Sequence, residues 1–449
     1  MGFFPAAVSR LFFIRFCPAA RLYLYPGSTY IPVLPISRFY LDPGYSCVTG
    51  RLGHSGDSPL LQPRAYSMLL SSYPPFRPAP WLSNAHVQTV AAYFSKHRAP
   101  NPRAEPLLVS LPDGDQIVVH DSQPKNWITG DRIAILVHGL CGSSESPYMR
   151  RITAKLMRAG VRVVRVDMRG WGASQFISRG HAHAGSSADV SCVVAAVQRL
   201  SPISKITLVG FSLGGNIVLH LAGQWGRGLG GSGEGLEPPA HVEPKGAETK
   251  RAAPIALQEE SPFSTKPGGE AFLFPPPQLE PWIAAPPEVD SVIAVSPPVD
   301  LELASANLRQ WGNRLYDWFF IDKLRLNLLE RRARVPNLLD NRLRAFPHRL
   351  VHFDDRFLAP VNGFHGARDY YARSSAGPLL AEVAIPTLII SSEDDPVVPV
   401  RMYRDWALSP SVELLLLKQG GHLGYLAGRP HDPDPYWLDW RLVQWISRI

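Results

Sequence analysis

The sequence predicts an α/β fold with a mostly parallel central sheet and helices on both faces, and three observations lead to this prediction. Short apolar runs, rich in β-branched residues, recur along the chain and indicate buried strands. These runs are 133–137, 161–166, 206–209, 292–295, 387–390 and 412–417. Segments of helical character separate several of them, which is typical of a parallel sheet with right-handed crossovers. Polar motifs follow several runs directly, where such sheets place their ligands.

The chain has 449 residues, which exceeds one ordinary domain but suits a large α/β unit carrying extra segments. Between 226 and 288 the pattern gives way to Gly, Pro, Glu and Lys, a composition that cannot bury a core. In chain order we predict a disordered extension (1–75), a first core part (76–225), a low-complexity disordered insertion (226–288), a core strand (289–300), a helical cap (301–380) and a last core part (381–449).

The first 75 residues allow three interpretations. The apolar stretch 3–16 is broken by Arg10 and Arg15, and no clear cleavage site follows it, which does not match a secretory signal peptide. A disordered extension is the favoured interpretation. A start codon placed too early, with Met68 as the true first residue, and a targeting segment are the two alternatives.

Composition and charge argue against a nucleic-acid-binding, a disulfide-bonded and a membrane-spanning protein. Lys and Arg exceed Asp and Glu by eight, but the surplus is scattered and does not interleave with aromatic residues, so no nucleic-acid partner is expected. The four cysteines have no C-x-x-C spacing, which favours a reducing, cytoplasmic environment without disulfides. No uncharged apolar run reaches about 18 residues, so no membrane span is predicted, while peripheral membrane contact stays open.

The remaining elements follow in order. The segment 80–89 is expected to form a short cap that leads into a helix through 94, and a β-hairpin spans 107–120 around the turn 112–115. Helices are expected near 148–159, 187–200 and 435–449. From 298 to about 380 the helical period returns without strands, which predicts either a cap over the site or extra packing on the sheet edge. The cap is favoured because this segment begins just after a strand's carboxyl end.

Ser212 lies at the centre of the strongest motif. Gly210 and Gly214 flank it at the G-x-S-x-G spacing, between a predicted strand and a predicted helix. Such a turn holds the serine hydroxyl at its tip and leaves the next backbone N–H free to bind an oxyanion. The pattern alone also fits an ordinary Gly/Ser turn, so the rest of the chain must supply a base and an acid.

A serine hydroxyl needs an imidazole to take its proton and a carboxylate to orient that imidazole. His422 follows the last predicted strand within a glycine-rich loop, and it is the expected base. Three acids follow the strand before it, Glu393, Asp394 and Asp395. Asp395 is preferred because two prolines fix the backbone directly after it; Asp394 is the alternative, and Glu393 is expected to face solvent.

An oxyanion hole needs two backbone donors. We expect one from Leu213, the residue after the serine, and one from the loop after the first core strand, either Leu140 or Cys141. His181 and His183 would share a face in an extended segment, but no acid or cysteine cluster completes a metal site beside them. No metal and no cofactor is therefore expected.

With these residues in place, the chain resembles AB-hydrolase family 4, the YheT-like group of bacterial esterases and eukaryotic lipid-acting hydrolases. The resemblance runs from about 76 to 449 and is interrupted by the insertion. It rests on the segments 81–89, 111–115, 138–140, 142–144, Ser146, 169–170, 210–216, 369–371 and 395–396. It implies an α/β-hydrolase fold with Ser212 as nucleophile, Asp395 as acid and His422 as base. The family's Tyr-His-x-Gly motif lacks its tyrosine here, since Ala182 stands in that place.

The sequence therefore predicts a serine carboxylic-ester hydrolase whose substrate is a small ester or a lipid. A medium-chain or fatty acyl group is suggested by an aromatic set in the predicted cap, Trp311, Tyr316, Trp318 and Phe319. Two alternatives stay open: acyl transfer to an alcohol through the same acyl-enzyme, and a catalytically silent scaffold that binds lipid or protein. The sequence does not predict an oligomeric state.

Overall fold

The computed structural model describes residues 75–94, 101–230, 273–274, 288–332, 346–428 and 431–448. All of them belong to one compact unit, residues 47–449. The predicted N-terminal extension, apart from its last residue, lies outside the described residues, and so does most of the predicted insertion 226–288.

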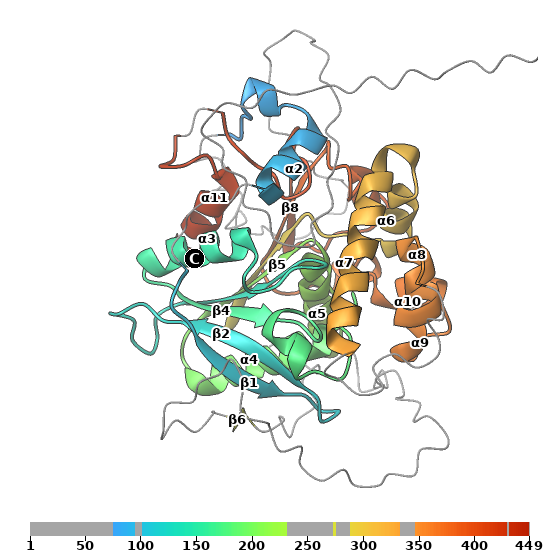
Figure 1. Ribbon diagram of the computed structural model, residues 1–449. Coiled ribbons are helices and arrows are strands. Elements are labelled where there is room, and N and C mark those ends of the chain that lie inside the picture. Colours follow the sequence, from blue (N-terminus) through green and yellow to red (C-terminus); the bar gives the residue numbers. More distant parts are fainter. Residues whose placement is uncertain are drawn as a thin grey trace, which may run out of the picture. The chain divides into compact units, whose positions relative to one another are not determined.

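The described strands form one mixed, mostly parallel sheet in the order β6-β1-β2-β4-β3-β5-β7-β8-β9 (Figure 1). The strands are β1 (Glu105–Ser110), β2 (Gln116–Ser122), β3 (Ile133–Val137), β4 (Arg162–Asp167), β5 (Ile206–Phe211), β6 (Leu273–Phe274), β7 (Val289–Val295), β8 (Thr387–Ser392) and β9 (Val412–Leu417). Strand β2 runs antiparallel to both β1 and β4, whereas β4, β3, β5, β7, β8 and β9 pair in parallel. The predicted fold class is confirmed.

Helices cover both faces of this sheet, as the alternation of side chains along β3 requires. Ile133 and Ile135 pack in the same apolar cluster as helices α4 (Ser187–Leu200) and α5 (Leu213–Gly230). Ala134 and Leu136 point the other way and pack with α3 (Pro147–Arg158) and α11 (Trp437–Arg448). Figure 1 shows α3 and α11 side by side on their face of the sheet.

Helix α5 extends beyond residue 225, where the Gly-rich composition predicts the start of the insertion. It runs to Gly230, so the first five residues of the predicted insertion are helical. Gly223 and Gly226 let this helix approach the 3₁₀ turn η6 (Gly377–Glu382), because a Cβ at Gly226 would overlap the carbonyl of Glu382. Glycine here therefore marks close packing as well as the start of a low-complexity segment. Strand β6 also falls within the insertion, paired with β1.

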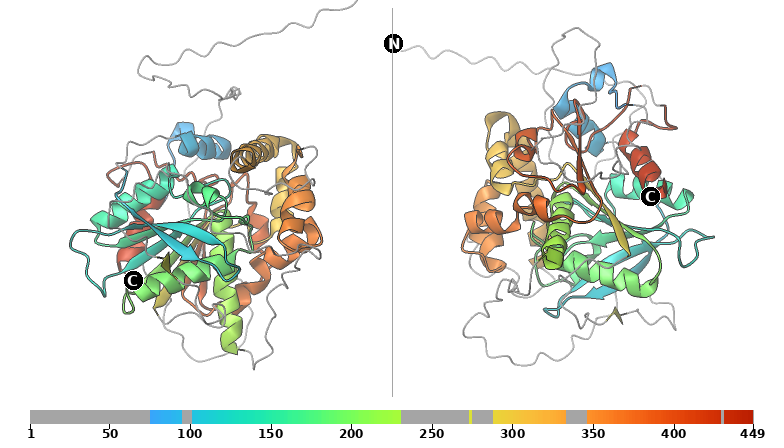
Figure 2. Two further views of the ribbon diagram at one scale, coloured as in Figure 1. Left: turned by 60° about the horizontal axis from the view of Figure 1, so that its bottom comes forward. Right: turned by 180° about the vertical axis from the view of Figure 1, so that it is seen from behind.

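The described part of residues 301–382 contains helical segments joined by turns, and no strand. The elements are α6 (Leu301–Leu308), η3 (Trp311–Asn313), α7 (Arg314–Arg332), α8 (Leu350–Phe353), the π-helical turn η5 (Asp354–Leu358), α9 (Ala359–Val361), α10 (Ala367–Ser374) and η6. Figures 1 and 2 show α6 to α10 gathered on one side of the sheet. The short elements elsewhere are η1 (Pro80–Leu82), α2 (Ala85–Phe94), η2 (Gly172–Phe176) and η7 (Val400–Tyr403).

Helices α2 and α7 lie next to each other, although more than 200 residues separate them along the chain (Figure 2, left). The ring of His86 stacks on that of Tyr316, and His86 Nδ1 lies 3.0 Å from the Tyr316 hydroxyl. Helix α2 therefore packs against the first turn of α7. Within the described residues, no helix has the length and apolar character needed to cross a membrane.

Candidate active site

Ser212 lies in the sharp turn between β5 and α5. Its φ of 51° is in the left-handed region, which is unusual for a residue with a side chain and marks a strained turn. The flanking glycines make the turn possible. A Cβ at Gly210 would overlap the carbonyl of Gly214, and a Cβ at Gly214 would lie 2.5 Å from the carbonyl oxygens of Val137 and His138. The motif thus lets the backbone close tightly enough to present the Ser212 hydroxyl.

The structure brings Ser212, His422 and Asp395 into one hydrogen-bonded chain. The Ser212 Oγ lies 2.9 Å from His422 Nε2, and His422 Nδ1 lies 2.9 Å from Asp395 Oδ2. The other oxygen of Asp395 accepts hydrogen bonds from the backbone N–H groups of Val397 and Val398, each at 2.8 Å. The Asp395 side chain is fully buried, so these bonds hold the carboxylate in a fixed orientation toward the imidazole.

The two neighbouring acids have different surroundings. Asp394 turns to the loop that carries the histidine, and its Oδ1 accepts a hydrogen bond from the Gly421 N–H at 3.0 Å. Partial burial raises the pKa of Asp394 above its usual range. Glu393 is exposed to solvent. Of the three candidates in the sequence, Asp395 is the one that faces the His422 ring.

Helix α2 supports the His422 loop, a role that sequence reasoning missed. The backbone N–H of His422 donates to Thr89 Oγ1 at 2.9 Å, and the buried Gln88 side chain bonds both the N–H and the carbonyl of Leu426. Gly421, with φ of 58°, packs so closely that a Cβ would lie 2.4 Å from a backbone oxygen of Ala85 if nothing moved. The only sequence signal was the resemblance of segment 81–89 to the family pattern.

We expect Thr89→Val to lower kcat about tenfold without unfolding the protein. Valine keeps the shape of threonine but leaves the His422 N–H without its acceptor, so the imidazole is held less firmly against Ser212. Ester-hydrolysis kinetics and thermal melting would be measured together. Thr89→Ser, which keeps the hydroxyl, should retain most of the activity; equal losses in both variants would contradict the hydrogen-bond explanation.

The loop after β3 approaches the serine closely. A Cβ at Gly139 would lie 3.0 Å from the Ser212 Cβ, so only glycine allows this contact without displacement. Among the described residues, the backbone N–H groups of Leu140 and Leu213 donate to no other protein group. Both residues line the pocket that contains Ser212. Two unpaired donors therefore lie where the sequence analysis expects an oxyanion hole. Cys141, the alternative donor, has φ of 59°, and burial raises the pKa of its thiol.

A buried carboxylate fixes the far side of this loop. Asp167, at the end of β4, accepts hydrogen bonds from the Ser144 N–H at 2.6 Å and the Ala173 N–H at 2.8 Å, and His120 Nε2 lies 2.9 Å from it. Burial alone would raise the pKa of Asp167, but the bonds from His120 and Ser144 and the nearby His138 hold the pKa below its usual range. Asp167 therefore ties the loop to the neighbouring strand.

Comparison with known families agrees with this geometry. A protein-family model described as the alpha/beta hydrolase fold matches residues 135–224 and 282–428, which is more than half of the chain. The chain belongs to the alpha/beta hydrolase fold family. The match spans Ser212, Asp395 and His422 as well as the loop of Leu140.

Individual relatives of this alpha/beta hydrolase include esterases and lipases. It is 26% identical to "Putative esterase YheT" of Escherichia coli over 84% of this chain and 94% of that protein. It is 21% identical to human "Monoacylglycerol lipase ABHD2" over 85% of this chain and 81% of that protein. Among solved structures it is similar to the Pyrococcus furiosus esterase Pf2001, with 14% identity and a TM-score of 0.41 over 77% of this chain and 92% of that chain.

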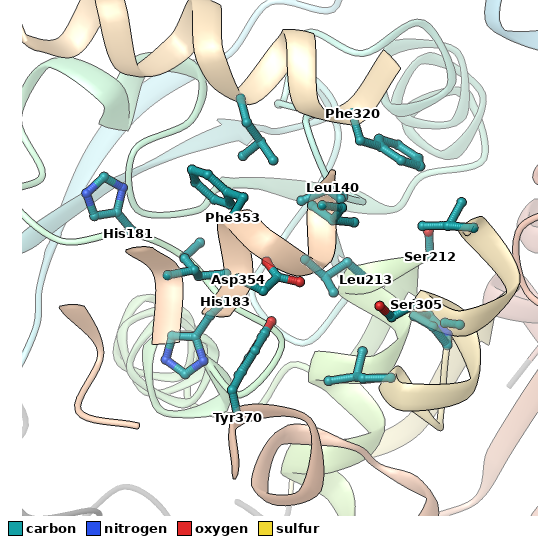
Figure 3. Close-up of a pocket in the computed structure, with 18 of the residues that line it drawn as sticks. Leu140, His181, His183, Ser212, Leu213, Ser305, Phe320, Phe353, Asp354 and Tyr370 are labelled. Atoms are coloured by element: carbon teal, nitrogen blue, oxygen red, sulfur yellow. The ribbon is translucent and has the colours of Figure 1, made fainter. Parts of the chain in front are cut away.

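The chain has a mostly apolar pocket that is lined in part by Ser212 (Figure 3). Its walls come from the turn of Ser212, the Leu140 loop and the helices of residues 301–382. The apolar lining includes Leu213, Leu301, Phe320, Leu324, Phe353 and Leu358. The pocket thus lies between the end of the sheet and the predicted cap.

The prediction that an aromatic set covers the pocket is wrong. In the described part of the chain, the lining does not include Trp311, Tyr316, Trp318 or Phe319. Trp311 is 84% exposed and Trp318 is 45% exposed. Within α7, Phe320, Leu324 and Leu328 recur every four residues and turn one face to the pocket, whereas Trp318 lies on a different face; Trp311 precedes this helix, in η3.

Polar side chains also line this pocket. His181 and His183 are partly buried there, and desolvation is the main cause that lowers the pKa of each to about 3, so both imidazoles are neutral at pH 7. Arg331 is fully buried at the end of α7; its guanidinium donates to the carbonyls of Ser178 and Gly180 and lies 2.9 Å from His181 Nδ1. Among the described residues, no group of His, Cys, Asp or Glu side chains is placed to bind a metal ion.

Asp354, in the same pocket, should make the stability of the protein depend on pH. Burial raises the pKa of Asp354 to about 7, against about 4 in an unfolded chain. Between these values the folded protein keeps a proton that the unfolded chain has lost, so stability falls as pH rises. From about pH 5 to pH 8, the free energy of unfolding should fall by about 2 to 3 kcal/mol relative to Asp354→Asn.

Urea unfolding of both proteins across this pH range would measure the difference. The Asn variant lacks the titrating group, so subtracting its curve removes the contributions of all other residues. Parallel curves for the two proteins would contradict the elevated pKa of Asp354.

Proposed function

We propose that this protein is a serine hydrolase that cleaves carboxylic esters through an acyl-enzyme on Ser212. The observation that carries the proposal is the continuous chain of two 2.9 Å contacts from the Ser212 hydroxyl through His422 to the buried Asp395. A serine with such an oriented base is an activated nucleophile. An unpaired pair of backbone N–H groups beside it adds the second requirement of acyl transfer.

In the proposed reaction, the Ser212 oxygen attacks the ester carbonyl carbon while His422 Nε2 takes the hydroxyl proton. The negative charge that forms on the carbonyl oxygen is stabilised by the N–H groups of Leu140 and Leu213. The bond to the alcohol then breaks, and the alcohol leaves with the proton from His422. Water attacks the acyl-enzyme by the same route and releases the carboxylic acid, while Asp395 stays ionised and orients the imidazole.

The substrate class is proposed to be medium-chain or fatty acyl esters. The support is the mostly apolar lining of the pocket, which includes Leu213 and Phe353. Such a lining favours an acyl chain over a charged group. Relatives with the names esterase and monoacylglycerol lipase support the same class.

Hydrolysis of p-nitrophenyl esters across a series of acyl lengths, with a fluorophosphonate probe alongside, tests the proposal. We expect turnover of at least part of the series and labelling of the wild type but not of Ser212→Ala. A folded protein that neither takes the label nor hydrolyses any ester would instead support a non-catalytic scaffold. Labelling that persists in Ser212→Ala would place the nucleophile elsewhere.

A further inference from the structure

The pocket contains a second polar centre besides Ser212. Asp354 is only 6% exposed, and its carboxylate lies among the lining residues, between Phe353 and Tyr370 in Figure 3. One carboxylate oxygen, Oδ2, lies 2.6 Å from the hydroxyl of Tyr371, which donates to it. The other oxygen, Oδ1, has no hydrogen-bond partner within the described residues.

The packing of the helices does not by itself account for this carboxylate. A buried carboxylate is costly unless its oxygens are hydrogen-bonded, and Tyr371 satisfies one oxygen only. The neighbouring charges, Asp317 and Asp355, oppose ionisation of Asp354 and do not offset its charge. Asp317 offers a contrast, because both of its oxygens are used: Oδ1 accepts from the Leu350 N–H and Oδ2 pairs with Arg349. Asp354 alone of the two keeps an oxygen directed to the pocket.

The surroundings favour a neutral hydroxyl group as the ligand. The buried guanidinium of Arg331 lines the same pocket and disfavours an ammonium group, while Asp354 itself disfavours an anion. The Ser305 Oγ lies 3.2 Å from the Tyr371 hydroxyl, which adds a further hydroxyl to the same cluster. Because burial raises the pKa of Asp354 to about 7, the carboxyl group is partly protonated at neutral pH. It can therefore both accept and donate to an alcohol.

We infer that Asp354, with Tyr371 and Ser305, forms a subsite that binds a hydroxyl group of the substrate at a distance from the scissile ester. This inference rests on the proposed ester hydrolysis at Ser212, since both groups line one pocket. Apolar residues, including Leu213 and Leu301, line the same pocket. The favoured ligand is thus an ester with an apolar stretch and a free hydroxyl, carried by either its alcohol or its acyl part.

Matched ester pairs test the subsite and identify which part carries the hydroxyl. One arm compares glyceryl monobutyrate with propyl butyrate; the other compares p-nitrophenyl 6-hydroxyhexanoate with p-nitrophenyl hexanoate. In the arm whose hydroxyl reaches the subsite, we expect wild-type kcat/KM to favour the hydroxylated ester by about 10- to 100-fold. The reason is that the ester without the hydroxyl leaves the buried polar group of the subsite unpaired. Asp354→Leu should bring that ratio close to one, and the isosteric Asp354→Asn should leave an intermediate ratio.

Asp317→Asn is the matched control, because Asp317 is also a buried acid of the helical region but does not line the pocket. It should keep the wild-type ratio, and thermal melting would confirm that each variant is folded. A wild-type ratio near one in both arms would overturn the inference. A ratio that Asp354→Leu and Asp354→Asn leave unchanged would overturn it as well.

A binding measurement separates this inference from the proposed function. The ethers 1-O-butylglycerol and butyl propyl ether differ in their hydroxyl groups and are not hydrolysed, so their binding to the wild type by calorimetry needs no turnover. Tighter binding of the glycerol ether, lost in Asp354→Leu, would support an alcohol-side subsite even if no ester were cleaved. For the acyl side, 6-hydroxyhexanamide and hexanamide serve in the same way. Equal binding within both pairs would refute the subsite, whatever the hydrolysis assays show.

Discussion

Replacing Ser212 by alanine should lower kcat for ester hydrolysis by about 10⁵- to 10⁶-fold, the loss seen when a serine hydrolase loses its nucleophile. The reason is that the acyl-enzyme cannot form. His422 would keep its contact with Asp395 at 2.9 Å, but the imidazole would have no hydroxyl to deprotonate. Residual activity should come from the backbone donors of Leu140 and Leu213 acting on a water molecule.

The measurement is kcat on the best ester of the p-nitrophenyl series, together with the melting temperature. Alanine removes the Oγ of a residue with φ of 51°, a conformation that is unusual for serine and alanine alike, so the fold should persist. Ser187→Ala is a matched control: Ser187 is buried at the start of α4, outside the pocket, and its change should alter kcat by less than about threefold. A Ser212→Ala protein that kept more than a hundredth of the activity would refute the proposed nucleophile.

The central part of the candidate site could be predicted because it follows from the order of the elements. Ser212, Asp395 and His422 each lie in the turn or loop that follows a strand of the parallel part of the sheet, and the carboxyl ends of such strands meet at one edge. Buried strands are long apolar runs, and for that reason their ends are visible in the sequence. The preference for Asp395 over Asp394 used the stiffness of the backbone after it, and in the structure the N–H groups of Val397 and Val398 fix that carboxylate.

Contacts between distant segments could not be predicted in this way. Thr89 lies 333 positions from His422, and no local pattern marks a threonine as the acceptor for a backbone N–H so far along the chain. The error over Trp318 has a different cause. Helical spacing identifies an amphipathic helix, but α7 has apolar residues on more than one face, and only the tertiary packing decides that Phe320 and Leu324 meet the pocket.

Asp354 was missed because nothing near it in the sequence resembles a site. It follows Phe353 in a helical segment, where a charged residue is usually on the solvated face. The contact with Tyr371 comes from the packing of η5 against α10. Pockets built from several helices of a cap therefore escape sequence reasoning, whereas residues at strand ends do not.

Asp395→Asn should lower kcat by about 10⁴-fold, while Asp394→Asn should lower it by less than about tenfold. Asp395 Oδ2 faces His422 Nδ1 at 2.9 Å, and a carboxylate there accepts the imidazole N–H and leaves Nε2 free to take the serine proton. An amide at this position can present its NH₂ group to Nδ1 and favour the wrong tautomer. The carboxylate also stabilises the charged imidazole that forms when Ser212 attacks, and the neutral amide cannot.

Asp394 provides the matched comparison, because it is the adjacent acid on the same loop. Its Oδ1 accepts the Gly421 N–H at 3.0 Å, and the carbonyl oxygen of asparagine can accept the same bond. The expected small loss therefore reports only on how firmly the His422 loop is held. Both variants preserve size and shape, so equal melting temperatures would assign any difference in kcat to chemistry rather than to folding. If Asp394→Asn abolished turnover and Asp395→Asn did not, the acid would be Asp394, and His422 would have to turn toward it when substrate binds.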